Sequence, residues 1–220
     1  MQTREAFHDG LKQLRKSIMV LGKDAGFAFS ESMEAFETND LVKFTEIKKN
    51  DYKINLLELS INEKATLLIA KQQPVASDLR KIITAIKISS DLERVGDLAV
   101  DIAKAAKRIP QIGTGTGIDT SKLIEMSKIA REMLEKSLIA YQNENVLEAQ
   151  RIAQVDDQVD ELYAQFIKEI FKNGIAVQSG IENLTQLAFI ARYIERIADY
   201  STNIAELVIY EVNGQYYDLN

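Results

Sequence analysis

The chain has 220 residues, of which 46% are hydrophobic and 27% are charged, enough to build a buried core. It has no cysteine and one histidine, His8, which excludes disulfides and thiolate sites and leaves a serine triad nearly untenable. The net charge of −6 argues against a nucleic-acid partner, because such proteins need a basic surface. No apolar run approaches the roughly 18 residues of a membrane-spanning helix, and the N-terminus lacks a signal-like apolar stretch. These features predict a cytoplasmic protein without membrane insertion.

The first half of the chain is predicted to form three helices. Breaks fall at a polar turn around residues 38–40 and at Pro74, because proline cannot donate a hydrogen bond inside a helix. We therefore expect helices over residues 4–37, over 41–72, and from Pro74 to about residue 109. Apolar residues recur near helical spacing in the second of these; they are Ile47, Ile54, Leu57, Ile61 and Leu68.

The second half of the chain repeats this plan. Helices are expected over residues 122–143, 146–172 and 181–212. The dipeptide Asn173-Gly174 is a typical helix stop, and Ser179 to Glu182 has the pattern of a capping box at a helix start.

A linker is predicted between two similar halves. Residues 113–117 alternate glycine with threonine and lack the Gly-Lys-Ser/Thr ending that a phosphate-binding loop needs. A shift of 105 residues aligns apolar and acidic positions of the two halves. We predict an all-α protein of six long helices, arranged as two tandem, similar three-helix bundles related by a pseudo-twofold axis, because two copies are too few for a solenoid. The first repeat is expected over residues 1–110, the Gly/Thr linker over 111–119 and the second repeat over 120–220.

An acidic motif occurs in the last helix of each half. The first copy runs from Glu93 to Ala103 and the second from Glu195 to Ala205. Residues four apart lie on one face of a helix, and like charges at that spacing destabilise it by about 0.2–0.5 kcal/mol per pair. We therefore predict that a cation offsets the repulsion. The stacked side chains are Glu93, Asp97 and Asp101 in one copy, and Glu195, Asp199 and Asn203 in the other.

Each motif has a companion on the preceding helix. Asp156 and Asp160 form it in the second half, and Asp51 with Asn55 matches them in the first half, with an amide in place of one carboxylate. Adjacent helices that carry such pairs would surround one or more hard cations with oxygen ligands. The alternative is a solvated acidic strip that pairs with nearby cationic side chains. The duplication of the motif favours the metal site.

The third helix is expected to have two apolar sides and a polar strip. Its strip consists of Arg80, Lys87, Asp91 and Arg94, which we predict to be solvated. Arg94 and Arg196 recur at the same place beside the acids, so we expect each to orient a carboxylate through paired hydrogen bonds. The main apolar face consists of Ile88, Leu92, Val95, Ala99, Ile102 and Ala106.

A stripe of small residues occurs in the first helix. Gly22, Gly26 and Ser30 are four residues apart, and glycine inside a helix costs about 1 kcal/mol relative to alanine. The stripe therefore needs a packing reason. We favour packing inside one bundle over contact with a second copy or a partner.

These motifs together resemble the PhoU family of phosphate-transport regulators, over essentially the whole chain. The resemblance rests on Gln73 to Arg80, on Ser90 to Asp97 and on Tyr193 to Asp199, combined with the duplication and the length. It implies multinuclear clusters of iron or zinc, with manganese or magnesium as further candidates, and it implies that the amides of Asn55 and Asn203 weaken their sites. The implied metal ligands are Glu93, Asp97, Asp101, Glu195, Asp199, Asn203, Asp156, Asp160 and Asp51.

The resemblance also implies a function. It implies a cytoplasmic negative regulator of phosphate uptake and of the phosphate-starvation response. Such a protein acts as an adaptor between the ATPase of a phosphate ABC transporter and a sensor histidine kinase. The resemblance further implies a homodimer, no catalytic residue, no organic cofactor, and contact with the membrane only through partners.

Two other classes of function stay open. The first is a structural helical adaptor whose acids bind no metal and keep the protein in solution. The second is a carboxylate-bridged di-iron enzyme, but such bundles use two Glu-x-x-His motifs. This chain has one, from Glu5 to His8, which disfavours the enzyme.

Overall fold

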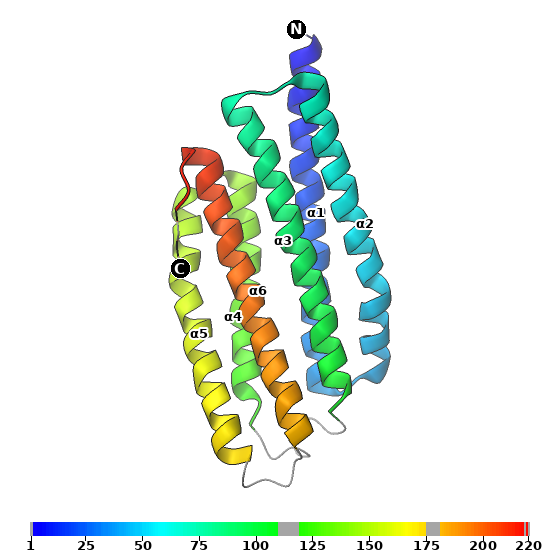
Figure 1. The fold of residues 1–220 in the computed structure, drawn as a ribbon, viewed down its shortest axis with the longest axis vertical. Coiled ribbons are helices and arrows are strands. Elements are labelled where there is room, and N and C mark those ends of the chain that lie inside the picture. The colour runs from blue at the N-terminus through cyan, green and yellow to red at the C-terminus, as the bar shows by residue number, and fades with distance from the viewer. Residues whose placement is uncertain (1, 110–118, 175–180, 218, 220) are drawn as a thin grey trace.

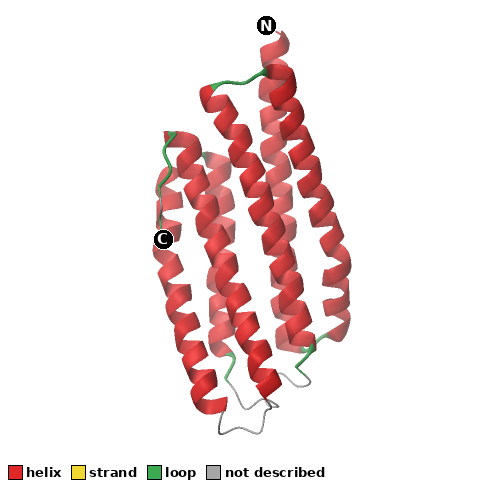
Figure 2. Ribbon diagram, in the orientation of Figure 1, coloured by secondary structure: helices red, strands yellow, loops and turns green. Residues whose placement is uncertain are grey.

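A computed structural model of the chain describes residues 2–109, 119–174, 181–217 and 219. All six predicted helices are confirmed to within about two residues at each end, and no strand forms in the described residues (Figure 2). The predicted linker at 113–117 and the start of the predicted capping box at 179–180 lie outside the described residues. The division of the chain into 1–110, 111–119 and 120–220 therefore stays a prediction. The helices are α1 (Gln2–Thr38), α2 (Leu41–Gln72), α3 (Ala76–Lys107), α4 (Ser121–Asn143), α5 (Val146–Gly174) and α6 (Ile181–Asn213).

The break between α1 and α2 and the end of α2 follow from local chemistry. Asp40 caps α2, because its Oδ1 accepts hydrogen bonds from the backbone N–H groups of Val42 at 2.9 Å and Lys43 at 3.1 Å. After α2, Gln73 adopts a left-handed backbone with φ 44° and its N–H donates to the carbonyl of Ile69. Pro74 then prevents the helix from continuing.

The helices form two elongated three-helix bundles that lie side by side (Figure 1). Helices α1, α2 and α3 pack against one another, as do α4, α5 and α6. The two bundles meet where α3 packs on α6 and α1 packs on α4. Helices α2 and α5 therefore lie on the outside, each in contact only with helices of its own bundle.

The core of each bundle follows the predicted apolar pattern. The main apolar face of α3 is fully buried. On α2, Ile47, Ile54 and Ile61 are buried, and Leu57 and Leu68 pack partly buried against the core. The hydrophobic effect, at about 25 cal/mol per Å² of apolar area buried, therefore drives the packing of both outer helices onto their neighbours.

The glycine stripe of α1 packs between the two bundles. A Cβ atom at Gly22 would lie only 2.6 Å from the Cδ1 atom of Leu138 on α4, and one at Gly26 would lie 3.6 Å from the Cδ2 atom of Leu134. The prediction of packing inside one bundle is therefore wrong: the stripe lets α1 of the first bundle approach α4 of the second.

The predicted solvated strip of α3 is also wrong in part. Arg80 and Asp91 are half-buried, and residues that follow α6 contact this strip at Arg80 and Lys87. Gly214 lies against the guanidinium of Arg80, and the Nζ of Lys87 donates to the hydroxyl of Tyr216 at 2.9 Å. Burial raises the pKa of Asp91 to about 7, with Lys87 acting in the opposite direction.

The lengths of the helices raise the question of a membrane span. None of the helices in the described part of the chain is long and apolar enough to cross a membrane.

Candidate functional site

The first acidic cluster lies where α2 packs on α3. Gly96 allows the close approach of the two helices, since a Cβ atom there would lie 3.0 Å from the Cδ1 atom of Ile54. That position is also 3.7 Å from the Oδ1 atom of Asp51, which places this carboxylate directly against α3. The charges of Asp97 and Asp101 both act on Asp51. We define this cluster as Asp51, Asn55, Glu58, Glu93, Asp97 and Asp101.

The carboxylates of the first cluster repel one another. Burial and then the charge of Asp97 raise the pKa of Asp51, and the same two causes raise the pKa of Glu93. Two cations offset part of this repulsion. Arg94 lies 3.2 Å from Asp97 and 3.7 Å from Glu93, and Lys104 lies 2.8 Å from Asp101.

The second acidic cluster lies where α5 packs on α6. It consists of Asp156 and Asp160 from α5 with Glu195 and Asp199 from α6. Burial raises the pKa of Asp156 to about 6, opposed by the nearby Thr202 hydroxyl and reinforced by the charge of Asp199. Burial and then Asp199 raise the pKa of Glu195 to about 7, and burial raises the pKa of Asp199 as well. Glu195 is therefore partly protonated near neutral pH, because burial disfavours its charged form.

An open hollow borders the second cluster. Its volume is about 580 Å³, and Asp156, Asp160 and Asp199 line it together with Leu219. The backbone N–H of Leu219 donates to the carboxylate of Glu206 at 2.8 Å, which holds this residue beside α6. The cluster is therefore reachable from solvent on one side, although Asp156 itself is buried.

The arginines of the two motifs behave differently. Arg94 pairs with the acids of its own motif, as predicted. Arg196 instead donates to the hydroxyl of Tyr200 at 3.0 Å. The arginine that donates to Glu195 is Arg192, one turn earlier. The expected orienting role of Arg196 is therefore wrong, and Arg192 has that contact in its place.

The chemistry of the donor set can be tested against a cation. Several carboxylate and amide oxygens are buried without any hydrogen-bond partner, which leaves them available as ligands; they are Asp51 Oδ1, Asn55 Oδ1, Asp156 Oδ1 and Glu195 Oε2. In the described residues, however, no three acidic or histidine side chains gather closely enough to hold a metal ion as they stand. The residues fit a hard cation by type and charge, and side-chain rotation within each cluster is required to close the ligand shell.

The predicted ligands divide between the two clusters. Asp51, Glu93, Asp97 and Asp101 come together in the first cluster. Asn203 lies one helical turn beyond Asp199 and is half-buried. Sequence reasoning missed Glu58, whose charge acts on Glu93; its position one turn after Asn55 was the available signal.

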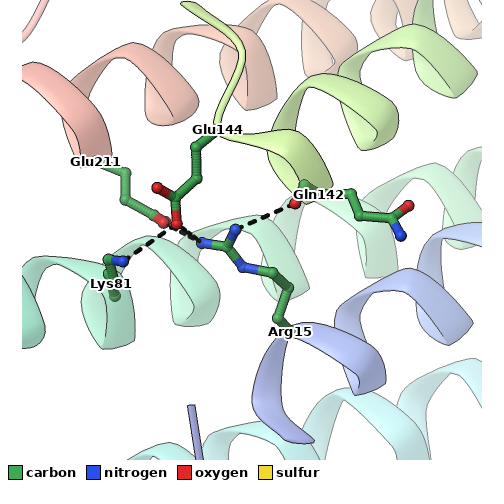
Figure 3. Close-up of polar contacts among 5 residues, drawn as sticks. All are labelled: Arg15, Lys81, Gln142, Glu144 and Glu211. Carbon is green, nitrogen blue, oxygen red and sulfur yellow. Dashed lines mark hydrogen bonds and ion pairs between the residues drawn. The ribbon is translucent and has the colours of Figure 1, made fainter. Parts of the chain in front are cut away.

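A third polar group joins the two bundles (Figure 3). Arg15 of α1 lies 2.9 Å from Glu144, at the end of α4, and also pairs with Glu211 of α6. Lys81 of α3 lies 3.1 Å from Glu144, and Arg15 donates to the backbone carbonyl of Gln142 at 3.3 Å. Burial raises the pKa of Glu211 to about 7, against the effect of Arg15. Because four separate elements supply this group, no local sequence pattern could predict it.

The fold and the clusters define a class of protein. The chain is a tandem pair of three-helix bundles, and each bundle carries a group of facing acids between its last two helices. The class that these features define is a tandem helical-bundle protein with two clusters of acidic side chains.

The sequence matches a known family twice. The model of the PhoU domain matches residues 18–106 and again residues 123–208. A relative from Clostridium acetobutylicum, named a phosphate-specific transport system accessory protein PhoU homolog, is 38% identical over 219 residues, which span 99% of each chain. A relative of the same name from Streptococcus pneumoniae is 34% identical over 217 residues, covering 99% of this chain and 100% of its own. The chain belongs to the PhoU family.

Solved structures share the fold. The crystal structure of the phosphate transport system regulatory protein PhoU from Streptococcus pneumoniae is similar with a TM-score of 0.89 and 32% identity, covering 96% of this chain and 99% of that one. The crystal structure of PhoU from Pseudomonas aeruginosa is similar with a TM-score of 0.90 and 28% identity, covering 95% of this chain and 100% of that one. The predicted tandem three-helix bundles are therefore confirmed.

Proposed function

We propose that this protein is a metal-binding negative regulator of phosphate uptake and of the phosphate-starvation response. It would act as an adaptor between the ATPase of a phosphate ABC transporter and a sensor histidine kinase. The support comes from relatives named as accessory proteins of a phosphate-specific transport system, which align over 95–99% of this chain. The cytoplasmic location, the homodimer and the absence of catalysis stay predictions of the family resemblance.

The observation that carries the metal-binding part is the pair of acidic clusters with unpartnered oxygens. In each cluster a carboxylate oxygen, Asp51 Oδ1 or Asp156 Oδ1, is buried without a donor. Burial raises the pKa values of Glu93 and Glu195, the neighbouring carboxylates of Asp97 and Asp199 raise them further, and Arg94 and Arg192 act in the opposite direction. A hard cation would replace protons as the neutralising charge.

In the second cluster, Asp156, Asp160, Glu195 and Asp199 would hold the cation. In the first, Asp51, Glu93, Asp97 and Asp101 would do so, with Asn55 as a neutral oxygen ligand. A bound multivalent cation attracts phosphate oxygens and thereby supplies a means of sensing an anion on an acidic surface. The protein residues fix the positions of the ligands through the rigid packing of α2 on α3 and of α5 on α6.

The regulatory step follows from linkage. A signal changes docking only if it binds the docked and undocked states with different affinity. We propose that the docked protein holds the kinase inactive when phosphate is plentiful, and that the acidic clusters contribute to the docking surface. No covalent chemistry is required of the chain in this scheme.

A reporter of phosphate-starvation genes tests the regulatory part. Deletion of the gene should raise expression in phosphate-rich medium, and the parent chain should restore repression. Unchanged expression on deletion would contradict the proposal. The decisive variant replaces Glu93, Asp97, Glu195 and Asp199 with alanine and should fail to repress. The matched control replaces four exposed acids outside the clusters, Glu37, Glu46, Glu125 and Glu182, and should repress fully.

An adaptor that needs no metal is the second candidate. The ion pairs of Arg94 with Asp97 and of Lys104 with Asp101 favour it, because they already offset part of the charge. Full repression by the cluster variant would support this candidate. The di-iron enzyme gains no support, because Glu5 and His8 are both exposed on α1.

A further inference from the structure

A polar pocket lies where the two bundles meet, beside the contact of Arg15 with Glu144. Its volume is about 430 Å³, which is within the range of small-molecule sites. Helix α1 supplies one side of the wall, α3 supplies one lysine, and the end of α4 supplies the rest. We call it the inter-bundle pocket, and its charged, polar and aromatic lining residues are His8, Lys12, Arg15, Lys81, Tyr141 and Glu144.

Positive charge predominates in the inter-bundle pocket. With His8 counted as neutral, its charged lining consists of three cations and one carboxylate, those of Lys12, Arg15, Lys81 and Glu144. A second carboxylate, that of Glu211, is buried and pairs with Arg15. Three further charged residues are near in sequence but do not line the pocket; they are Asp9, Lys16 and Asp78. A chain with a net charge of −6 therefore has a local excess of positive charge here.

The carboxylate of Glu144 occupies the position where this pocket binds an anionic oxygen. Its Oε1 atom lies 2.9 Å from the Nη2 atom of Arg15 and 3.1 Å from the Nζ atom of Lys81 (Figure 3). The guanidinium of Arg15 is held in place, because it lies 4.9 Å from the centre of the Tyr141 ring and donates to the carbonyl of Gln142. The side chain of Glu144 is 42% exposed, so an anion from solvent can compete with it for the two cations.

The backbone of Glu144 indicates that its side chain has a specific role. Glu144 has φ 51° and ψ 38°, a left-handed conformation that glycine and asparagine adopt more readily than glutamate. The 105-residue shift that relates the halves places Asn39 at the equivalent turn of the first bundle, with φ 53°. The turn therefore forms more easily with asparagine, and the glutamate is explained by the cations that its carboxylate binds.

The charges that Glu144 leaves unmatched identify the kind of ligand. Lys12 forms no hydrogen bond or ion pair with any residue that the structure describes. With Glu144 rotated away, the three cations of the pocket would face only the single negative charge of Glu211. A dianion with several oxygens matches this excess of two positive charges. A phosphoryl group has that charge and shape, and arginine and lysine are its usual ligands in proteins.

We propose that the inter-bundle pocket binds a phosphoryl dianion through Lys12, Arg15 and Lys81, in competition with the carboxylate of Glu144. The ligand is inorganic phosphate or a phosphate monoester, which present the same dianion. The site is separate from the two acidic clusters and requires no metal ion, so the inference goes beyond the proposed function and does not depend on it. Binding would exchange the ion pairs of Glu144 between the two bundles for contacts with the ligand.

Calorimetric titration of the chelator-stripped protein tests the binding, with inorganic phosphate and glycerol 3-phosphate as the probes. The parent chain should bind at least one of them at one site per chain. Tighter binding of glycerol 3-phosphate would assign the site to a phosphate monoester, and tighter binding of inorganic phosphate would assign it to the free ion. Absence of binding of both probes by the parent chain would overturn the proposal.

A variant of the pocket locates the binding. Lys12→Gln with Lys81→Gln should raise the dissociation constant at least tenfold, because it removes two of the three cations. Arg15 is retained in this variant, since its loss would leave the buried carboxylate of Glu211 without its cationic partner. The matched control changes two exposed lysines of α2 to glutamine and should leave the constant unchanged; they are Lys48 and Lys49. Equal binding by the pocket variant and the parent would overturn the proposal.

Two further variants test the competition and the independence from the acidic clusters. Glu144→Asn should lower the dissociation constant several-fold, because it removes the competing carboxylate and asparagine fits the left-handed backbone. A gain in affinity cannot result from a loss of folded protein, and binding no tighter than that of the parent would overturn the competition. The second variant should bind both probes as the parent does, and its failure to bind would place the phosphoryl site in the acidic clusters and overturn the proposal; it has alanine at Glu93, Asp97, Glu195 and Asp199.

Discussion

The first and second acidic clusters occupy equivalent places in two bundles of the same fold, yet they differ in burial. In the first cluster the side chain of Glu93 is 23% exposed, and Asp97 and Asp101 pair with Arg94 and Lys104. In the second, the side chain of the equivalent Glu195 is only 10% exposed. The same acidic motif therefore has different electrostatics in the two halves, because burial, and not the motif itself, sets the pKa values.

The cationic partners of the two clusters differ as well, whereas each set of aligned positions contains one amide. The first has Asn55 where the second has Asp160, and the second has Asn203 where the first has Asp101. In the second cluster, Glu195 has a cationic partner in Arg192, but no ion pair to Asp156 or Asp160 forms among the described residues. We infer that the second cluster binds a cation more tightly than the first cluster does.

The largest effect is expected on cation affinity. In chelator-stripped protein, Glu195→Ala with Asp199→Ala should lower the affinity for Mn²⁺ or Fe²⁺ at the tighter site at least tenfold, about 1.4 kcal/mol. The equivalent pair, Glu93→Ala with Asp97→Ala, should leave this tighter site unchanged and remove only the weaker one. Calorimetric titration measures the affinities of both sites. Loss of the tighter site in the Glu93→Ala, Asp97→Ala variant, with the weaker site lost in the other variant, would contradict the comparison.

Stability of the metal-free protein should depend on pH. The folded pKa of Glu195 is about 7, against 4.5 as its ordinary value, so the folded state binds more protons between these values. The stabilisation that protonated Glu195 contributes to the free energy of unfolding is therefore fully present below about pH 4.5. It is lost as the pH rises through 7.

In chemical unfolding, Glu195→Gln should reduce the change of the unfolding free energy across this pH range by about 1–2 kcal/mol, a figure that allows for solvent screening. Glu93→Gln, at a more exposed position, should remove less. If the two variants reduced the pH dependence of the unfolding free energy equally, burial would not distinguish the clusters.

Asn55→Asp should make the first cluster resemble the second. The added carboxylate lies four residues from Asp51, so the metal-free protein should lose about 0.2–0.5 kcal/mol of unfolding free energy. The affinity of the first cluster for the cation should rise several-fold, because ligand charge tunes such sites. A variant that loses stability but gains no affinity would indicate that Asn55 does not face the bound ion.

The smallest effect is expected for Arg94→Gln. Its side chain is 58% exposed, and exposed ion pairs contribute only about 0–1 kcal/mol. Thermal unfolding in metal-free buffer should therefore change by no more than this, with Arg192→Gln as the equivalent change beside the buried Glu195. A larger loss for Arg94→Gln than for Arg192→Gln would contradict the assignment of the stronger electrostatics to the second cluster.

The helices could be predicted because their signals are local. Asp40 and Pro74 mark the start and end of α2 through backbone hydrogen bonding alone. The core faces of α2 and α3 follow from helical periodicity, and the duplication made both acidic motifs visible. Residue type and spacing were sufficient for each of these features.

Features that depend on packing between distant segments could not be predicted. The partner of Gly22 is Leu138, and the position of α4 against α1 is not encoded in either helix alone. The contact of Gly214 with Arg80 brings the residues after α6 against α3, and the contact of Arg15 with Glu211 joins opposite ends of the sequence. Equally, Arg192 and Arg196 are both close to the acids in sequence, and only side-chain packing selects the one that contacts Glu195.

The most direct test of the account is elemental analysis after equilibration with iron, zinc, manganese and magnesium followed by removal of free metal. The parent chain should retain metal. The control with Glu37, Glu46, Glu125 and Glu182 changed to alanine should retain the same amount. The variant with Glu93, Asp97, Glu195 and Asp199 changed to alanine should retain none. Equal metal content in the parent and the cluster variant, whether high or negligible, would contradict the claim that the two acidic clusters are cation sites.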